Sequence, residues 1–126
     1  MIRVAQGAEH KDARGTIRDL LIADLDGATI ITTKAGAIRG NHYHQDTTQW
    51  TYVLDGSIKV VTEMLPEPPL HDTLQTGEMM VSPPMERHAW QAIEDSIVLV
   101  LTKGPRSGED YESDVVRLEG ESRLIA

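Results

Sequence analysis

The sequence predicts an all-β domain, either a sandwich or a barrel of short strands. Short β-branched or apolar segments alternate along the chain with turn signals such as Asp26-Gly27 and Asp55-Gly56. No segment shows a convincing amphipathic-helix pattern. Turn signals at such short intervals are typical of sandwiches and barrels, in which hairpins join neighbouring strands.

The expected strands follow one another along the chain. Residues 16–23 have a mixed pattern that permits a first strand, and residues 28–33 are rich in β-branched side chains, which suit a pleated sheet. The turn at Asp55-Gly56 predicts a hairpin between residues 49–54 and 57–62. The remaining expected strands are residues 78–81, 87–92, 97–102 and 115–118, of which 97–102 is the most apolar and is therefore expected to be central.

Three stretches are expected to lie outside strands. Residues 63–72 contain three prolines, and residues 103–111 are interrupted by glycine and proline, so both read as loops. The acidic residues 109–112 are interpreted as a solvated surface loop. Residues 119–126 are interpreted as a tail of a single domain that spans residues 1–126.

Composition limits the possible partners and locations. The net charge of −8 argues against nucleic acid and against an anionic membrane as partners. The longest aliphatic run, residues 97–101, is far too short to span a bilayer, and residues 1–12 lack the apolar core of a signal peptide. The chain has no cysteine, so thiolate ligands and disulfides are excluded and a cytoplasmic location is the default expectation.

Three histidines and a glutamine occur within two glycine-framed segments. The first segment begins at Gly36, contains His42, His44 and Gln49, and ends at Gly56; the second runs from Gly77 to His88. Two residues that are i and i+2 on a strand project from the same face, about 6–7 Å apart along it. The imidazoles of His42 and His44 are therefore expected side by side, where a third from a distant strand can join them. Neutral imidazole is a common ligand of transition metals.

These two segments resemble the two signature motifs of the cupin superfamily. The resemblance implies a double-stranded β-helix, which is a small jelly-roll barrel with a central pocket. It places His42, His44 and His88 on the three histidine ligand positions of the family, and Gln49 where the family usually has glutamate. It therefore implies a divalent metal ion (zinc, iron, nickel or manganese) held by these four residues. A glutamine offers a neutral oxygen, so the metal is expected to be held less tightly than by glutamate.

A narrower resemblance lies in the segment Arg39-Gly40-Asn41-His42-Tyr43-His44, which follows a distant Arg14-Gly15 pair. This segment is similar to the cupin-type sugar-nucleotide isomerases and epimerases, which act on deoxythymidine-diphosphate-linked keto-deoxyhexoses without metal. The resemblance implies that His42 acts as a base and that Arg39 contacts the substrate.

Three classes of function therefore remain open. The first is a metal-binding cupin, with or without enzyme activity, whose ligand is a small polar molecule. The second is a metal-free sugar-nucleotide isomerase in which His42 or His44 is the general base and Arg39 binds the substrate. The third is a non-catalytic module that binds a sugar or another small ligand. We take the metal-binding cupin as the main hypothesis and a small molecule as its ligand in every case.

The pattern of residues 49–54 also predicts an assembly. Trp50, Tyr52 and Leu54 share the strand face opposite Gln49, and together they present more apolar surface than a barrel exterior usually does. We therefore expect a homodimer that buries either this face or the N-terminal strand.

Overall fold

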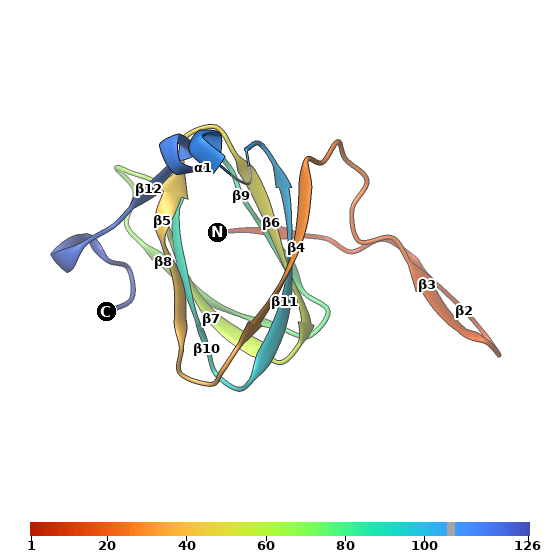
Figure 1. The fold of residues 1–126 in the computed structure, drawn as a ribbon. Helices are drawn as coiled ribbons and strands as arrows, with labels where there is room; N and C mark the ends of the chain where they lie inside the picture. The colour runs from red at the N-terminus through yellow and green to blue at the C-terminus, as the bar shows by residue number, and fades with distance from the viewer. Residues whose placement is uncertain (106–107) are drawn as a thin grey trace.

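Two facing antiparallel sheets and a projecting hairpin make up the computed structural model, which describes residues 1–105 and 108–126 (Figure 1). The first sheet has the order β1 (Ile2–Val4), β9 (Met79–Ser82), β6 (Thr48–Asp55), β11 (Ser96–Lys103) and β4 (Gly27–Thr33). The second has the order β12 (Val115–Arg117), β5 (Ile38–His44), β10 (Arg87–Ala92), β7 (Ser57–Glu63) and β8 (Leu70–Gln75). The hairpin consists of β2 (Glu9–Asp12) and β3 (Gly15–Arg18). This architecture confirms the predicted all-β, jelly-roll barrel.

The core lies between the two sheets and is made of alternating residues of each strand. Val53, Val98 and Val100 of the first sheet pack against Ile58 and Val60 of the second, all at most 2% exposed. Burying one such side chain stabilises the fold by roughly 1.5–3 kcal/mol. The strand β11 pairs with β4 on one side and with β6 on the other, so the most apolar segment is indeed central.

Most expected strands are confirmed, and the exceptions have local causes. The strand at residues 87–92 matches β10, and Asp55-Gly56 forms the turn between β6 and β7. The short edge strand β1 and the exposed strand β2 were not expected, because three or four residues carry too little periodicity to be recognised. The predicted loop at residues 63–72 is wrong at its end, since β8 begins at Leu70 and pairs with β7.

The predicted loop at residues 103–111 is also partly wrong. A short α-helix, α1 (Gly108–Asp114), begins within it and lies at one end of the barrel (Figure 1). A seven-residue helix spans only two turns, so its sequence shows no clear 3.6-residue period. Its first turn carries Glu109 and Asp110, which favour a helix N-terminus.

The N-terminal segment folds over the outer face of the first sheet. The strand predicted at residues 16–23 ends already at Arg18. Beyond it, Leu20 and Leu21 pack against a buried cluster that includes Tyr52. The hydroxyl of Tyr52 accepts a hydrogen bond from Arg18 Nη2 at 2.9 Å. The face predicted to bind a second subunit is therefore partly covered by the chain itself. Leu54 of that face remains 40% exposed.

No helix among residues 1–105 and 108–126 is both long and apolar enough to cross a membrane. The C-terminal residues 118–125 run beside β5 and include a short 3₁₀-helix, η1 (Gly120–Ser122). This segment is hydrogen-bonded to Asn41 of β5, so it is attached to the barrel.

Candidate functional site

Pairing of β5 with β10 brings the three histidines together inside the barrel. His42 lies directly opposite His88 in the ladder, and His44 lies two residues further along β5 on the same face. The ring centroids are 4.8 Å apart for His42 and His88, 5.0 Å for His42 and His44, and 5.9 Å for His44 and His88. One ring nitrogen from each residue lies within 4.8 Å of the others. The structure thus contains the cluster of three histidines that the sequence spacing predicts.

The backbone beside the cluster has an unusual conformation that only particular residues permit. Gly40 has φ of +84°, and a Cβ added there would lie 2.9 Å from the carbonyl oxygen of His88. Asn41 has φ of +59°, in the left-handed region that asparagine tolerates better than most residues. The pairing register shifts between His88 and Ala89 at the same place. Gly40 and Asn41 therefore create the bulge that aims His42 across at His88.

His88 is the most deeply buried of the three histidines, at 1% exposure. Burial, together with the neighbouring His42 and His44, lowers the pKa of His88 from 6.5 to about 3. Neither of its ring nitrogens has a hydrogen-bond partner of normal geometry among the described residues. A buried polar atom without a partner costs about 1–3 kcal/mol. A ligand that accepts the lone pair of neutral His88 would remove that cost.

His44 is oriented by an acidic residue that sequence analysis did not identify. Its Nδ1 lies 2.9 Å from Oδ2 of Asp114, the last residue of α1. The same carboxylate accepts hydrogen bonds from Thr47 Oγ1 at 2.7 Å and from the amide of Asp46 at 2.6 Å. Burial alone would raise the pKa of Asp114, but these hydrogen bonds hold it below the usual range. The ionised carboxylate therefore keeps the His44 proton on Nδ1, and the lone pair of the neutral ring is on Nε2.

Gln49 and Arg39 also line the histidine pocket, which has a volume of about 160 Å³. Gln49 is 7% exposed, and its Nε2 lies 3.4 Å from Thr51 Oγ1, so its carbonyl oxygen is the atom available to a ligand. Arg39 donates only to neutral acceptors, the Thr32 carbonyl at 2.9 Å and Thr33 Oγ1 at 3.2 Å. With no acidic partner among the described residues, its charge is available to an anionic ligand.

Two further residues complete the pocket wall. Trp90, two residues beyond His88 on the same strand, lines the pocket and is 2% exposed. Tyr111 of α1 also lines it, with its ring 6.0 Å from that of His44. The interpretation of residues 109–112 as a solvated surface loop is therefore wrong for the loop and for Tyr111, whereas the three acidic residues of this stretch are indeed exposed. No spacing rule connects Tyr111 or Asp114 with histidines about 70 residues earlier, so sequence reasoning missed both.

Comparison with known proteins agrees with this architecture. The family model described as Cupin matches residues 24–110. The chain therefore belongs to the cupin family. No curated protein matches the chain significantly in sequence.

Solved structures of similar fold include enzymes named for nucleotide-linked sugars. The chain is similar to a dTDP-4-dehydrorhamnose 3,5-epimerase from Sulfolobus tokodaii, with a TM-score of 0.73, 19% identity, and coverage of 90% of this chain and 74% of that one. It is similar to the sugar 3,4-ketoisomerase QdtA from Thermoanaerobacterium thermosaccharolyticum, with a TM-score of 0.75, 19% identity, and coverage of 89% and 84%. It is also similar to the TDP-fucose-3,4-ketoisomerase WlaRA from Campylobacter jejuni, with a TM-score of 0.73, 14% identity, and coverage of 88% and 84%. At these identities the likeness establishes the fold.

Proposed function

We propose that this cupin binds a divalent metal ion through His42, His44 and His88, with Gln49 at or near a fourth position. The observation that carries the proposal is the convergence of three imidazoles, one of which, His88, is buried with neither ring nitrogen hydrogen-bonded to any residue that the structure describes. A buried polar group of this kind in a folded protein calls for a ligand or a bound ion.

The donor set fits such an ion. Three nitrogens that each lie about 2.1 Å from one tetrahedrally coordinated ion are about 3.4 Å apart. The donor atoms lie within 4.8 Å of one another, so rotations of the imidazole rings would have to bring them closer by at most about 1.4 Å. The contact of His44 with Asp114 is the carboxylate–histidine arrangement that fixes the tautomer of a metal ligand. A bound divalent ion would supply a Lewis acid to a small ligand in the pocket.

Zinc titration by calorimetry tests the proposal. Replacing one of three imidazole ligands should weaken zinc binding about a hundredfold or more, so His88→Ala should show little heat at concentrations that saturate the wild type. His71→Ala is the matched control, because His71 lies exposed on β8 outside the cluster. Equal zinc affinity in wild type and His88→Ala would contradict the proposal.

A second candidate is a metal-free keto-sugar isomerase, and the contact between His44 and Asp114 favours it. An imidazole whose Nδ1 proton is held by an ionised carboxylate can take a proton at Nε2 and is stabilised when it becomes charged. Tyr111 and Arg39 line the same pocket, and Arg39 has no acidic partner among the described residues. The similar solved structures include enzymes named as isomerases and epimerases of such sugars.

Proton exchange separates this candidate from metal binding. The protein is incubated in D₂O with TDP-4-keto-6-deoxyglucose, and deuterium next to the carbonyl is followed by NMR. An isomerase should incorporate deuterium after chelator treatment, and Asp114→Asn should slow the exchange. No exchange above the protein-free control would exclude this substrate.

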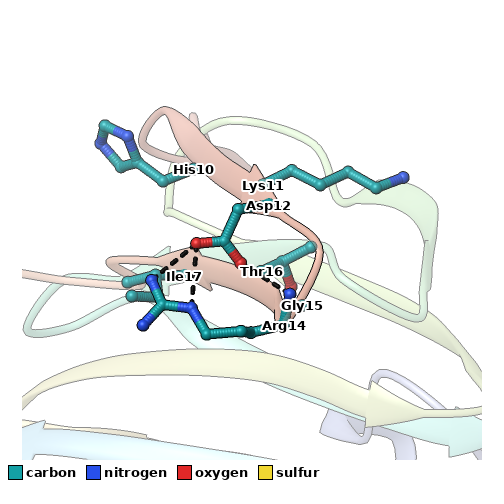
Figure 2. Close-up of a pocket in the computed structure, with 7 residues that line it drawn as sticks. All are labelled: His10, Lys11, Asp12, Arg14, Gly15, Thr16 and Ile17. Carbon is teal, nitrogen blue, oxygen red and sulfur yellow. Dashed lines mark hydrogen bonds and ion pairs between the residues drawn. The ribbon is translucent and has the colours of Figure 1, made fainter.

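A homodimer is the remaining proposal, and the hairpin β2–β3 supports it. The hairpin projects from the barrel (Figure 1), and Figure 2 shows that the turn is held by its own ion pair, with Arg14 Nη2 2.7 Å from Asp12 Oδ2. Ile17 on the hairpin and Ile22 beyond it are 70% and 88% exposed. An isolated two-stranded hairpin is at best marginally stable in water. Contact with a second copy would cover this apolar surface, and light scattering at micromolar concentration should give the mass of a dimer.

A further inference from the structure

A second groove lies beside the histidine pocket, between β5 and the C-terminal segment. It has a volume of about 360 Å³, and Gly40 and His42 line both the groove and the pocket. The groove is therefore next to the proposed ligand site and shares one of its imidazoles. Its outer wall comes from residues 117–126, beyond the part of the chain that the cupin model matches.

Asn41 fixes that outer wall in place. Its side-chain amide donates to the carbonyl of Ile125 at 2.8 Å, and its Oδ1 accepts from the amides of Leu124 at 2.8 Å and Ile125 at 3.2 Å. Its backbone carbonyl accepts a further bond from the amide of Leu118 at 2.7 Å. One residue next to His42 thus holds both ends of the segment 118–125, and the groove is a built feature of the fold.

The groove carries two guanidinium groups and one side-chain carboxylate, that of Glu119, in a protein whose net charge is −8. Arg123 is exposed, and its side chain makes no hydrogen bond or ion pair with any residue the structure describes. Arg117 pairs with Glu112 at 3.2 Å, with both side chains about 60% exposed. An exposed pair of this kind contributes at most about 1 kcal/mol, so Arg117 can exchange Glu112 for another anion.

We propose that Arg117 and Arg123 form an anion subsite that takes a phosphate or diphosphate group carried by the ligand of the histidine pocket. Guanidinium groups bind phosphate oxygens through paired, charge-assisted hydrogen bonds. The groove is larger than the histidine pocket, so it suits the more extended part of a ligand whose small polar ring lies among the imidazoles. Arg39, which has no acidic partner in the part of the chain that the structure describes, lines the pocket where it meets the groove at Gly40. This inference rests on the proposed function, because it assumes that the histidine pocket holds the ligand.

Inorganic pyrophosphate is the probe that tests the subsite. NMR titration of chelator-treated, full-length protein should shift the signals of Asn41, Leu124 and Ile125. Arg123→Gln and Arg117→Gln should each weaken binding about three- to tenfold, and the double variant should weaken it further. Arg14→Gln, whose arginine lies in the distant hairpin, should bind pyrophosphate like the wild type. No binding by the wild type, or equal loss in Arg14→Gln, would overturn the proposal.

A gain of binding provides a second test that misfolding cannot imitate. Glu112→Gln removes the carboxylate that competes with pyrophosphate for Arg117, and it should tighten pyrophosphate binding about two- to threefold. Glu109→Gln removes the same charge from the same helix without releasing an arginine and should have a smaller effect. Equal effects of the two variants would show that only overall charge matters and would count against the subsite.

Zinc affinity measured in the same variants separates the two proposals. Arg117 and Arg123 lie outside the cluster of three histidines, so the double variant should bind zinc like the wild type. Loss of pyrophosphate binding with zinc binding intact would support the subsite. Zinc binding with no pyrophosphate binding in the wild type would overturn the subsite alone. Pyrophosphate binding that follows both arginines, with no zinc binding, would overturn only the metal proposal.

Discussion

The histidine pocket and the projecting hairpin are both built from paired antiparallel strands but differ in what holds them in place. In the pocket, β5 pairs with both β10 and β12, and His44 is 4% exposed and bound to Asp114. In the hairpin, β2 and β3 pair only with each other, and all four residues of β2 are exposed. The pocket geometry is thus fixed by the chain itself. The exposed side chains of the hairpin are available for contact with another molecule.

This difference suits the pocket to ligand binding and the hairpin to contact between subunits. Side chains that bind or react need positions set by packing and hydrogen bonds, and the buried end of the barrel provides them. A segment that joins subunits needs exposed apolar groups, and residues near the hairpin provide those. Changes in the pocket should therefore alter ligand binding and pH dependence. Changes in the hairpin should alter oligomeric state and leave the pocket intact.

The largest expected effect concerns the stability of the metal-free protein at low pH. The pKa of His88 is about 3 when folded but 6.5 ordinarily, so between these values the unfolded chain binds the extra proton. Stability should therefore fall as the pH drops from about 6.5 toward 3, by at most about 1.4 kcal/mol per pH unit for this group. Urea unfolding between pH 7 and 4 measures the slope. His88→Gln should have a shallower slope, whereas His71→Gln should keep that of the wild type; equal slopes in all three proteins would contradict the buried, neutral state of His88.

Removal of the carboxylate behind His44 should have the next largest effect. Asp114→Asn leaves the shape of the side chain but removes the charge that orients the ring, and loss of such a partner typically costs tenfold to a hundredfold in metal affinity. Asp110→Asn is the matched control, because Asp110 lies exposed on the same helix. Zinc calorimetry on both variants checks the result, and an unchanged affinity in Asp114→Asn would show that the contact is only structural.

Gln49→Glu should act in the opposite direction. A carboxylate at this position adds a charged ligand to a divalent site, and we expect zinc to bind about ten- to a hundredfold more tightly once desolvation is counted. In a metal-free sugar pocket the same change would raise the basicity of His42 and His44 instead, and zinc would stay unbound. Negligible heats in both proteins would favour the isomerase.

The smallest effect on the fold should come from the hairpin. Ile17→Asp changes an exposed side chain, so the stability of the barrel should stay within about 0.5 kcal/mol of the wild type. If the hairpin joins two subunits, light scattering should nonetheless show a shift from dimer to monomer. Ile30→Asp, at an exposed apolar position on β4, should keep the dimer mass. A shift in Ile30→Asp alone would place the interface on the barrel.

The sequence predicted the parts of the site that are marked by local pattern. Glycine frames and the i, i+2 spacing identified His42 and His44, and the second frame identified His88, because each depends on neighbours within one strand or turn. Asp114 lies 70 residues from His44 and reaches it only through pairing of β12 with β5. Arg123 likewise reaches the pocket only through the contacts of Asn41 with the C-terminal segment. Such contacts between distant segments leave no periodic signal, so only the structure reveals the carboxylate that orients His44 and the groove beside the pocket.

Elemental analysis of protein purified without chelator or affinity tag tests the central claim most directly. A site of three converging imidazoles, in which neither ring nitrogen of the buried His88 has a hydrogen-bond partner among the described residues, should retain close to one divalent ion per chain, and His88→Ala purified in the same way should lose it. Wild-type protein that contains no zinc, iron, nickel or manganese, and whose melting temperature does not change when these ions are added, would contradict the claim.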